Sequence, residues 1–326
     1  MYWQPGPTPG SVVASAPAKL NLTLEVGPPR QDGYHPIVSV MVPLSLTDEL
    51  LLCERRDDEI VLEVTMADPL AAPLGADQDN LAWRAARLLQ DFAWQALGVR
   101  KGVSIHLHKR IPVAAGLGGG SADAAAVLVG LNALWQLGLA TGELSALGER
   151  LGADVPFCIR SKAGLVEGIG EQYTPLAVVP RIPVVLLNPR RPLSTAHVFR
   201  SFDAVGEPRS PGEHTAQMVR ALFSGDLRNI AKAVYNDLGQ PARHLIAEIG
   251  QMEAFLRTAG ALTVQVTGSG PTVFGIMESG EHAREVFELC RSDARDWWAW
   301  WGWAGSVESL ISETGSRELG AATCKG

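Results

Sequence analysis

A short segment in the first half of the chain carries four glycines within five positions, Gly116, Gly118, Gly119 and Gly120. Because glycine has no Cβ, such a segment can curl with its backbone N–H groups pointing inward and can approach an anion closely. Residues 122–137, which follow it, are mostly small and apolar and predict a helix. The free amides and the positive dipole end of a helix N-terminus attract anions. The segment therefore predicts a phosphate-binding loop.

Two other glycine motifs fit this loop poorly. A Walker A loop needs Gly-Lys-Ser or Gly-Lys-Thr at its end, whereas Ser121 follows Gly120 directly. A dinucleotide fingerprint has its glycines directly after a strand, whereas residues 110–115, including Pro112, intervene here. A flexible turn is the remaining alternative, but the good helix behind the loop favours a phosphate cradle.

Further groups suited to phosphoryl transfer lie near the loop and elsewhere in the chain. Lys109 and Arg110 precede it, and the Ser121 hydroxyl can cap the helix, bind a phosphate oxygen or help to hold Mg²⁺. Transfer to an alcohol also needs a group for the hydroxyl proton and a cation for the developing charge. Asp154 and Lys19 are candidates. The residues alone leave open whether Asp154 is a helix cap, and whether the Lys19 ammonium faces a site or only extends to the protein surface. The pattern predicts an ATP-dependent kinase of a small molecule.

Composition limits the classes of partner. The chain has 326 residues and a formal net charge of −7, which argues against general nucleic-acid binding. Residues 1–10 are rich in Pro and Gly and uncharged, unlike a signal peptide or an anchor. No apolar stretch reaches the roughly 20 residues of a membrane span. We therefore expect a soluble cytoplasmic protein without nucleic-acid or membrane partners.

Strand-like and helical segments alternate along the chain. Strands are expected at residues 12–26, 37–46, 50–53, 60–65, 103–107, 182–187, 262–266 and 272–277. Helices are expected at 79–97 with Asp79 as N-cap, and at 122–137, 144–151, 195–202, 214–223, 241–258 and 281–290. This order predicts an α+β fold with α/β-type layers and two domains, with the active site in the cleft between them. The expected parts are an ATP-binding and catalytic domain (1–164), a substrate-covering α/β domain (165–307) and a mobile tail (308–326).

Three segments together resemble the superfamily of galactokinase, homoserine, mevalonate and phosphomevalonate kinases. They are residues 16–22 (APAKLNL), 112–125 and 266–271 (VTGSGP), in matching order and separation over about residues 11–306. The Gly-Glu-His signature of mevalonate kinases and galactokinases is missing.

Within the superfamily, Lys19-Leu20-Asn21 followed by Asp32-Gly33-Tyr34-His35 is similar to the 4-diphosphocytidyl-2-C-methyl-D-erythritol kinases of non-mevalonate isoprenoid (terpenoid) biosynthesis. Residues 151–156 (LGADVP) and 236–238 (NDL) also resemble that family. The resemblance implies ATP-dependent phosphorylation of the substrate's 2-hydroxyl, giving the 2-phosphate and ADP. The implied partner is a small molecule with a cytidine diphosphate group, with Mg²⁺ as cofactor.

The resemblance also implies roles for individual residues. The catalytic pair falls on Lys19 and Asp154, with Asp154 accepting or orienting the hydroxyl proton and Lys19 stabilising charge. Tyr34 and His35 resemble the residues that hold the cytosine end. The ATP-binding set comprises Pro112, Val113, Ala114, Ala115, Gly116, Leu117, Gly118, Gly119, Gly120, Ser121 and Ala122, with Lys109, Asn80 and Leu81. The further substrate contacts are Asn21, Thr195, Phe199, Gly268, Ser269 and Gly270.

Some features leave alternatives open. Five tryptophans between residues 297 and 303 indicate either packing at the edge of the core or an exposed patch that makes a homodimer. No acid is assignable as a second Mg²⁺ ligand beside Ser121. The alternatives to the main prediction are a superfamily kinase for another small alcohol, such as mevalonate or homoserine, and a non-catalytic ATP-binding protein of the same fold.

Overall fold

The computed structural model describes residues 2–68, 74, 78–177, 179–205, 210–293 and 295–305, so the predicted tail at 308–326 lies outside the described residues. The strands are β1 (Tyr2–Pro5), β2 (Ser11–Asn21), β3 (Thr23–Val26), β4 (Ile37–Arg55), β5 (Ile60–Met66), β6 (Gly102–Lys109), β7 (Gly164–Glu167), β8 (Gln172–Pro175), β9 (Ile182–Asn188), β10 (Tyr235–Asn236), β11 (Thr263–Val266), β12 (Val273–Ile276) and β13 (Trp298–Ala304). The helices are α1 (Leu81–Leu97), α2 (Gly119–Leu134), α3 (Thr141–Glu149), α4 (Val155–Arg160), α5 (Thr195–Val205), α6 (Glu213–Ser224), α7 (Leu227–Ala233), α8 (Gly239–Leu245), α9 (Glu248–Thr258) and α10 (Gly280–Ser292). This mixture of sheet and helices confirms the predicted α+β class.

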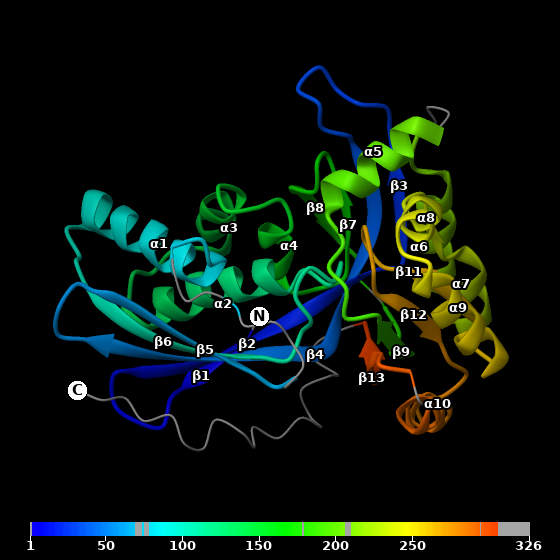
Figure 1. The fold of residues 1–326 in the computed structure, drawn as a ribbon. Coiled ribbons are helices and arrows are strands. Elements are labelled where there is room, and N and C mark those ends of the chain that lie inside the picture. Colours follow the sequence, from blue (N-terminus) through cyan, green and yellow to red (C-terminus); the bar gives the residue numbers. More distant parts are fainter. Residues whose placement is uncertain are drawn as a thin grey trace.

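The long strand β4 connects the two halves of the sheet (Figure 1). It pairs antiparallel with β2, β3, β6 and β7, and its residue Leu44 pairs with Ala304 of β13. The sheet then continues through β9, β12 and β11. The sequence predicted two strands here, at 37–46 and 50–53. They are one strand, because residues 47–49 continue the ladder opposite Pro17, Ala16 and Ser15.

Helices α1–α4 lie on one face of the N-terminal strands (Figure 1). Alternate residues of β4 and β6, such as Leu52 and Ile105, meet Leu89 of α1 and Leu128 of α2 in one fully buried cluster. Burying such side chains away from water stabilises each by about 1.5–3 kcal/mol. This packing sets the N-terminus of α2, with the glycine loop before it, against the end of the sheet.

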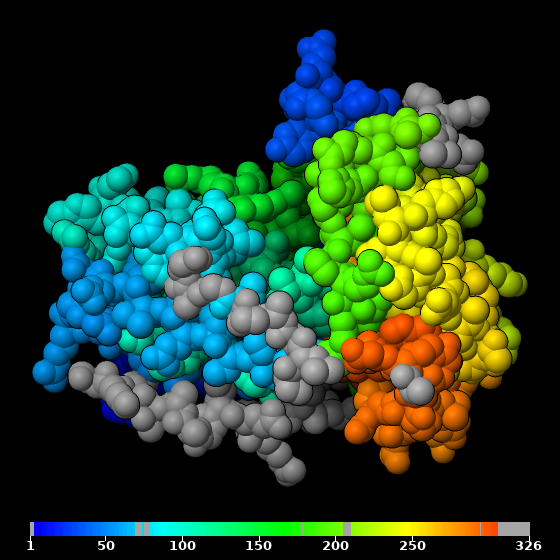
Figure 2. All heavy atoms as spheres, viewed as in Figure 1, coloured from blue at the N-terminus to red at the C-terminus, as the bar shows by residue number. Residues whose placement is uncertain are grey.

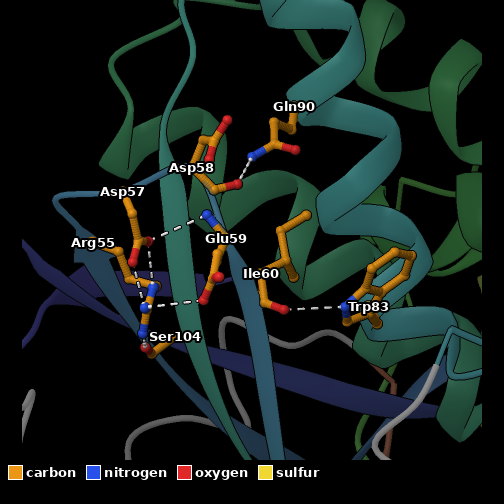
Figure 3. A network of polar contacts seen from close by, with 8 residues as sticks. All are labelled: Arg55, Asp57, Asp58, Glu59, Ile60, Trp83, Gln90 and Ser104. Carbon is orange, nitrogen blue, oxygen red and sulfur yellow. Dashed lines mark hydrogen bonds and ion pairs between the residues drawn. The ribbon is translucent and has the colours of Figure 1, made fainter.

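A network at the edge of the sheet fixes α1 (Figure 3). The Gln90 amide donates to the carbonyl of Asp58 at 2.8 Å, and the Trp83 indole N–H donates to the carbonyl of Ile60 at 3.2 Å. These bonds satisfy strand-edge carbonyls that would otherwise be left to solvent. The helix begins one residue later than predicted: Asn80, and not Asp79, is its N-cap, because the Asn80 side chain accepts from the Ala82 N–H at 3.0 Å.

The C-terminal strands are covered on both faces. Helices α9 and α10 share one buried cluster with Val185 of β9, whereas α6 shares another cluster with Val184, the adjacent residue of the strand, which faces the opposite way. The predicted helix at 241–258 is two helices, because Ile246 takes an extended backbone conformation (φ −134°, ψ 104°) between α8 and α9. The sequence also missed α7 and β10, which are short.

The tryptophan-rich segment is the last described strand, β13. Trp298 and Trp300 pack against one buried cluster, and Trp297 and Trp301 pack against another. Trp303 lies under the Arg181 guanidinium, 4.3 Å from the ring centre. These contacts favour edge packing over an exposed patch, and the homodimer stays a prediction.

Two further expectations concern the whole chain. None of the helices formed by the described residues has the length and apolar character needed to cross a bilayer. The cytoplasmic location and the domain boundary at residue 164 stay predictions. The hairpin of β7 and β8, just after that boundary, pairs with β4.

Candidate active site

A cleft of about 1070 Å³ lies where the two halves of the sheet meet. Its walls come from the end of β2, the glycine loop, the segment before α4, the segment between β3 and β4, helix α5 and the turn between β11 and β12. The segment between β3 and β4 projects from the molecule beside α5 (blue in Figures 1 and 2). Residues far apart in sequence therefore share one cavity.

The glycine loop requires glycine at two positions. Gly116 has φ of 76°, and a Cβ there would lie 2.4 Å from the carbonyl oxygen of Thr267. Gly118 has φ of 68°, and a Cβ there would lie 2.8 Å from Cγ of Lys19. Left-handed φ and contacts below 3 Å both exclude a side chain. The loop is thus pressed against the catalytic candidate on one side and the β11–β12 turn on the other.

Of the three roles that the sequence left open for Ser121, capping of the following helix is the one that the structure excludes. Helix α2 begins at Gly119, with Gly118 as its N-cap and no side-chain capping bond. Because the helix starts earlier than predicted, Ser121 lies within the first turn, where its hydroxyl lines the cleft. The first-turn amides are left for an anion.

Lys19 and Asp154 lie beside each other in this cleft. The Lys19 ammonium is 4.0 Å from the Asp154 carboxylate and donates to the Asn21 side-chain carbonyl at 2.6 Å. The Lys19 side chain is only 6% exposed, whereas that of Asp154 is 31% exposed. A buried ammonium beside a more open carboxylate gives a fixed cation and a reachable proton acceptor.

The alternative of Asp154 as a helix cap is also settled by geometry. Asp154 occupies the N-cap position of α4, but its side chain makes no capping hydrogen bond. Pro156 lies at the second position of that helix, where the missing N–H needs no partner. The carboxylate is therefore left to face the cleft.

Lys109 is held by two carboxylates that the sequence did not point to. Its ammonium donates to Asp48 and, at 2.6 Å, to Asp123, and all three side chains are less than 5% exposed. Burial alone would lower the pKa of Lys109, but the charges of Asp123 and Asp48 outweigh burial and raise it. Burial raises the pKa of Asp123 well above its ordinary value, and Lys109 offsets only part of this. The Lys109 ammonium is thus already bound by two carboxylates of the protein itself.

The cleft wall formed by α5 and the segment between β3 and β4 carries aromatic side chains. Tyr34 is 60% exposed, and the His35 ring lies 5.2 Å from the ring of Phe199 on α5. His35 Nδ1 is 2.9 Å from the carbonyl oxygen of Gly27, and Nε2 is 3.3 Å from the carboxylate of Asp203. An exposed ring beside a fixed imidazole can take a flat heterocycle between them.

The turn between β11 and β12 is fastened from two directions. The Asn236 amide donates to the carbonyls of Val266 and Gly268, at 2.8 and 2.9 Å. The hydroxyls of Thr195 and Ser269 are 2.9 Å apart, which joins the turn to the start of α5. These bonds hold Gly268 and Ser269 at the cleft wall.

The structure brings most of the predicted site residues together. Three do not line the cleft, namely Leu117, Ala122 and Gly270. Leu117 and Ala122 are fully buried in the core, and the backbone of Gly270 supports Gly116 from behind. These three residues can therefore contribute to the site only by supporting its walls. The binding roles of the residues that do line the cleft stay predictions.

Sequence reasoning missed several lining residues, of which Asp79, Asp123, Arg200 and Asp203 are ionisable. A signal existed for Asp203, because residues 195, 199 and 203 recur every four positions and so share a face of α5. A signal also existed for Asp123, a single acid within a run of alanines at the start of a buried helix.

Known proteins with similar sequences point to one enzyme family. Residues 80–162 match the GHMP kinases N terminal domain, and residues 218–293 match the GHMP kinases C terminal domain. The 4-diphosphocytidyl-2-C-methyl-D-erythritol kinase of Symbiobacterium thermophilum is 44% identical over 86% of this chain and 96% of its own length. The enzyme of that name from a Synechococcus species is 44% identical over 87% of this chain and 91% of its own.

A solved structure agrees with the sequences. The crystal structure of a 4-(cytidine 5′-diphospho)-2C-methyl-D-erythritol kinase superposes with a TM-score of 0.71 at 34% identity. The match covers 90% of this chain and 99% of the crystallised one. Together with the cleft between two halves and its glycine loop, these matches show that the chain belongs to the 4-diphosphocytidyl-2-C-methyl-D-erythritol kinase family of the GHMP kinases.

Proposed function

We propose that this chain transfers the γ-phosphoryl group of ATP to the 2-hydroxyl of 4-diphosphocytidyl-2-C-methyl-D-erythritol, giving the 2-phosphate and ADP in isoprenoid biosynthesis. The observation that carries the proposal is the Lys19–Asp154 pair, 4.0 Å apart, in the cleft that the glycine loop also lines. The family to which the chain belongs supports the choice of substrate.

The protein's own residues divide the reaction between them. Amides of the glycine loop and of the first turn of α2 hold the triphosphate and pre-organise it before transfer. Asp154 accepts or orients the proton of the attacking hydroxyl. Lys19 stabilises the charge that develops as the oxygen attacks, and a loose phosphoryl transition state asks little more of a base.

Mg²⁺ is part of the proposal, and the residues present fit it. No three His, Cys, Asp or Glu side chains of the described segments gather as a metal site. Mg²⁺ keeps several waters and usually binds one or two protein oxygens together with substrate phosphates, so such a cluster is not needed. The Ser121 hydroxyl would hold the ion at the phosphates, since Ser121 lines the cleft in the first turn of α2. The ion would neutralise phosphate charge during transfer.

The substrate end of the cleft suits a cytidine group. Tyr34 and Phe199 offer rings on which a pyrimidine can stack, and Asn21, Thr195 and the Gly268–Ser269 turn line the same cleft as Lys19. Binding of the base by the rings would give specificity, while the hydroxyl reacts at Lys19 and Asp154.

The test is ADP release by the purified full chain with ATP, Mg²⁺ and each of three alcohols: the cytidine substrate, mevalonate and homoserine. We expect turnover with the cytidine substrate only. Asp154→Ala should lower kcat by about 100-fold or more, because the proton acceptor is lost. Glu149→Ala, an exposed acid at the end of α3, is the matched control and should behave as wild type.

The other outcomes separate the alternatives. Turnover with mevalonate or homoserine instead would overturn the substrate assignment and the use of Tyr34 and His35. Binding of ATP without ADP release in any of the three reactions would indicate a non-catalytic nucleotide-binding protein.

A further inference from the structure

A series of three buried hydrogen bonds leads from the Lys19 ammonium, through Asn21 at the cleft wall, to residues that do not line the cleft. Lys19 Nζ donates to Asn21 Oδ1 at 2.6 Å, and Asn21 Nδ2 donates to Ser39 Oγ at 2.9 Å. Ser39 Oγ in turn donates to the backbone carbonyl of Thr23 at 2.5 Å. Asn21 is 1% exposed and Ser39 is 0% exposed, so water cannot replace any of these bonds.

The donor and the acceptor of each hydrogen bond in this series are determined. A carbonyl oxygen only accepts, so the single hydroxyl hydrogen of Ser39 goes to Thr23. The Ser39 oxygen then faces Asn21 with a lone pair and needs an N–H donor. Only the amide nitrogen of Asn21 can supply it, which turns the amide oxygen toward Lys19.

The opposite orientation of the Asn21 amide would place acceptor against acceptor at Ser39 and donor against donor at Lys19. Its oxygen would face the Ser39 oxygen with no hydrogen between them, and its NH₂ group would face the Lys19 ammonium, which is itself only a donor. Buried groups left in this way lose their hydrogen bonds without compensation from water. Ser39 therefore excludes the orientation that would push Lys19 away.

Lys19 needs this anchor because its other neighbours are less close. Its distance to the Asp154 carboxylate is 4.0 Å, longer than a hydrogen bond. The backbone of Gly268 also lies close, because a Cβ built at Gly268 would be 3.0 Å from Lys19 Nζ. The side-chain oxygen of Asn21 is thus the acceptor that fixes the ammonium at hydrogen-bond distance.

From this geometry we infer that Ser39 is a positioning residue for phosphoryl transfer, acting on Lys19 through the side chain of Asn21. The inference rests on the proposed function, because it assigns Ser39 a part in that reaction. Ser39 itself lies in β4 behind the cleft and is not among its lining residues.

The central test is Ser39→Ala, measured by steady-state kinetics with ATP and the cytidine substrate. We expect kcat to fall by about 10- to 100-fold, because small displacements of an oriented group cost this much. KM for ATP should stay within about threefold, since the glycine loop is untouched. Ser39→Thr keeps the hydroxyl and should recover most of the lost kcat.

The matched control is Ser145→Ala. Ser145 is 4% exposed, donates to the carbonyl of Thr141 at 2.8 Å and accepts from Arg160 at 2.7 Å. It thus repeats the bonding pattern of Ser39 in α3, outside the cleft. Its replacement should lower stability as Ser39→Ala does but leave kcat unchanged.

A double-mutant cycle with Asn21→Ala tests the route of the effect. Since Ser39 acts through Asn21, Asn21→Ala combined with Ser39→Ala should be no slower than Asn21→Ala alone. The inference would be overturned if the losses of kcat in the two single variants multiplied in the double variant, or if Ser39→Ala kept the wild-type kcat.

A second readout needs no turnover and separates the two proposals. The side-chain amide protons of Asn21, assigned in nitrogen-15 spectra by their loss in Asn21→Ala, should exchange slowly with solvent. We expect exchange to be about tenfold faster or more in Ser39→Ala and unchanged in Ser145→Ala. Unchanged exchange in Ser39→Ala overturns the relay, whereas an inactive wild type with the expected exchange would overturn only the proposed reaction.

Discussion

Asp48 holds three N–H groups at the point where β6 leads into the glycine loop. Its Oδ1 accepts from the backbone N–H of Arg110 at 2.6 Å and of Ile111 at 2.8 Å, and its Oδ2 accepts from Lys109. Asp123 also accepts from Lys109, but its Oδ1 has no hydrogen-bond partner. The two carboxylates beside one ammonium are therefore not equivalent.

This difference predicts unequal costs for the two amide replacements. Asp48→Asn puts an NH₂ group against either Lys109 or two backbone donors and should lower the free energy of unfolding by about 2–4 kcal/mol. Asp123→Asn keeps an oxygen for Lys109 and places its NH₂ at the unpartnered position. It also removes an excess buried negative charge, so it should cost less than about 1 kcal/mol. Urea unfolding at pH 7 measures both, and equal losses would contradict this account of the trio.

At this scale the sequence predicts reactive groups better than their supports. Lys19 and Asp154 were assigned because each lies in a segment that resembles the family, residues 16–22 and 151–156, whereas the residues alone left both roles open. Asp48 was missed because residues 47–49 fell between two predicted strands, and aspartate is common in connecting segments. Its true position, within a ladder and at 0% exposure, depends on Lys109, a partner 61 residues away.

Among the elements, the glycine loop and the β11–β12 turn act as one unit. Gly116 is in contact with the backbone of Thr267 and Gly270, and the Thr272 N–H points to the carbonyl of Ala115. The phosphate side and the substrate side of the cleft are therefore fixed against each other through backbone atoms.

Gly116→Ala should disturb both sides at once. The substitution forces alanine into φ of 76° and its Cβ to within 2.4 Å of a carbonyl oxygen. We expect the free energy of unfolding to fall by about 2–4 kcal/mol and nucleotide affinity by about tenfold or more. Calorimetric titration with a non-hydrolysable ATP analogue and urea unfolding give the two values.

Gly142→Ala is the control for this substitution. Nothing lies within 4 Å of a Cβ at Gly142, which is in the first turn of α3 and outside the cleft. It should leave affinity unchanged and raise stability by up to about 1 kcal/mol, because alanine favours helix. Undiminished affinity in Gly116→Ala would contradict the close packing described for the loop.

Strand β3 is joined to helix α6 through the buried carboxylate of Glu25. The Thr215 N–H, in the first turn of α6, donates to Glu25 at 2.7 Å. Burial alone would raise the pKa of Glu25, but backbone N–H groups of Thr215, Gly212 and His214 outweigh burial and lower it below 4.5. A carboxyl group with a lowered pKa stabilises the fold above its unfolded pKa and loses that effect as the pH falls through its folded pKa.

Glu25→Gln should therefore lower stability in a pH-dependent way. At pH 7 we expect a loss of about 1–3 kcal/mol, because a charge-assisted bond becomes a neutral one. The difference in free energy of unfolding between wild type and variant should narrow as the pH falls below 4.5, the ordinary pKa of this carboxyl group. Urea unfolding between pH 3.5 and pH 7, with exposed Glu281→Gln as control, gives the difference, and a difference that widens on acidification would refute the assignment.

The elements show where sequence patterns suffice and where they do not. The helix α1 and the strand β6 were predicted because their apolar residues repeat regularly, and α2 was predicted because its residues are small and favour helix. The joining of two strands into β4, and the break between α8 and α9, depend on pairing and packing with distant residues. Local periodicity contains no information about such distant partners.

At the scale of the whole molecule, one sheet joins two halves and the cleft lies where they meet. The short pairing of β13 with β4, at Ala304 and Leu44, and the longer pairing of β13 with β9 make this connection. Lys19 and Asp154 come from the first half, and Thr195, Phe199 and Ser269 come from the second. The family resemblance predicted this meeting, whereas spacing alone could not pair residues 135 positions apart.

The most direct test of the central claim is the proton-coupled phosphorus-31 spectrum of the product made from ATP and 4-diphosphocytidyl-2-C-methyl-D-erythritol. The carbon at position 2 of that substrate carries a methyl group and no hydrogen, so a phosphate on its oxygen has no three-bond proton neighbour. We predict one new phosphomonoester signal that is a singlet, with the diphosphate signals of the substrate retained. A doublet or triplet, which would place the phosphate on the 3- or 1-oxygen, or inorganic phosphate alone, would contradict the account.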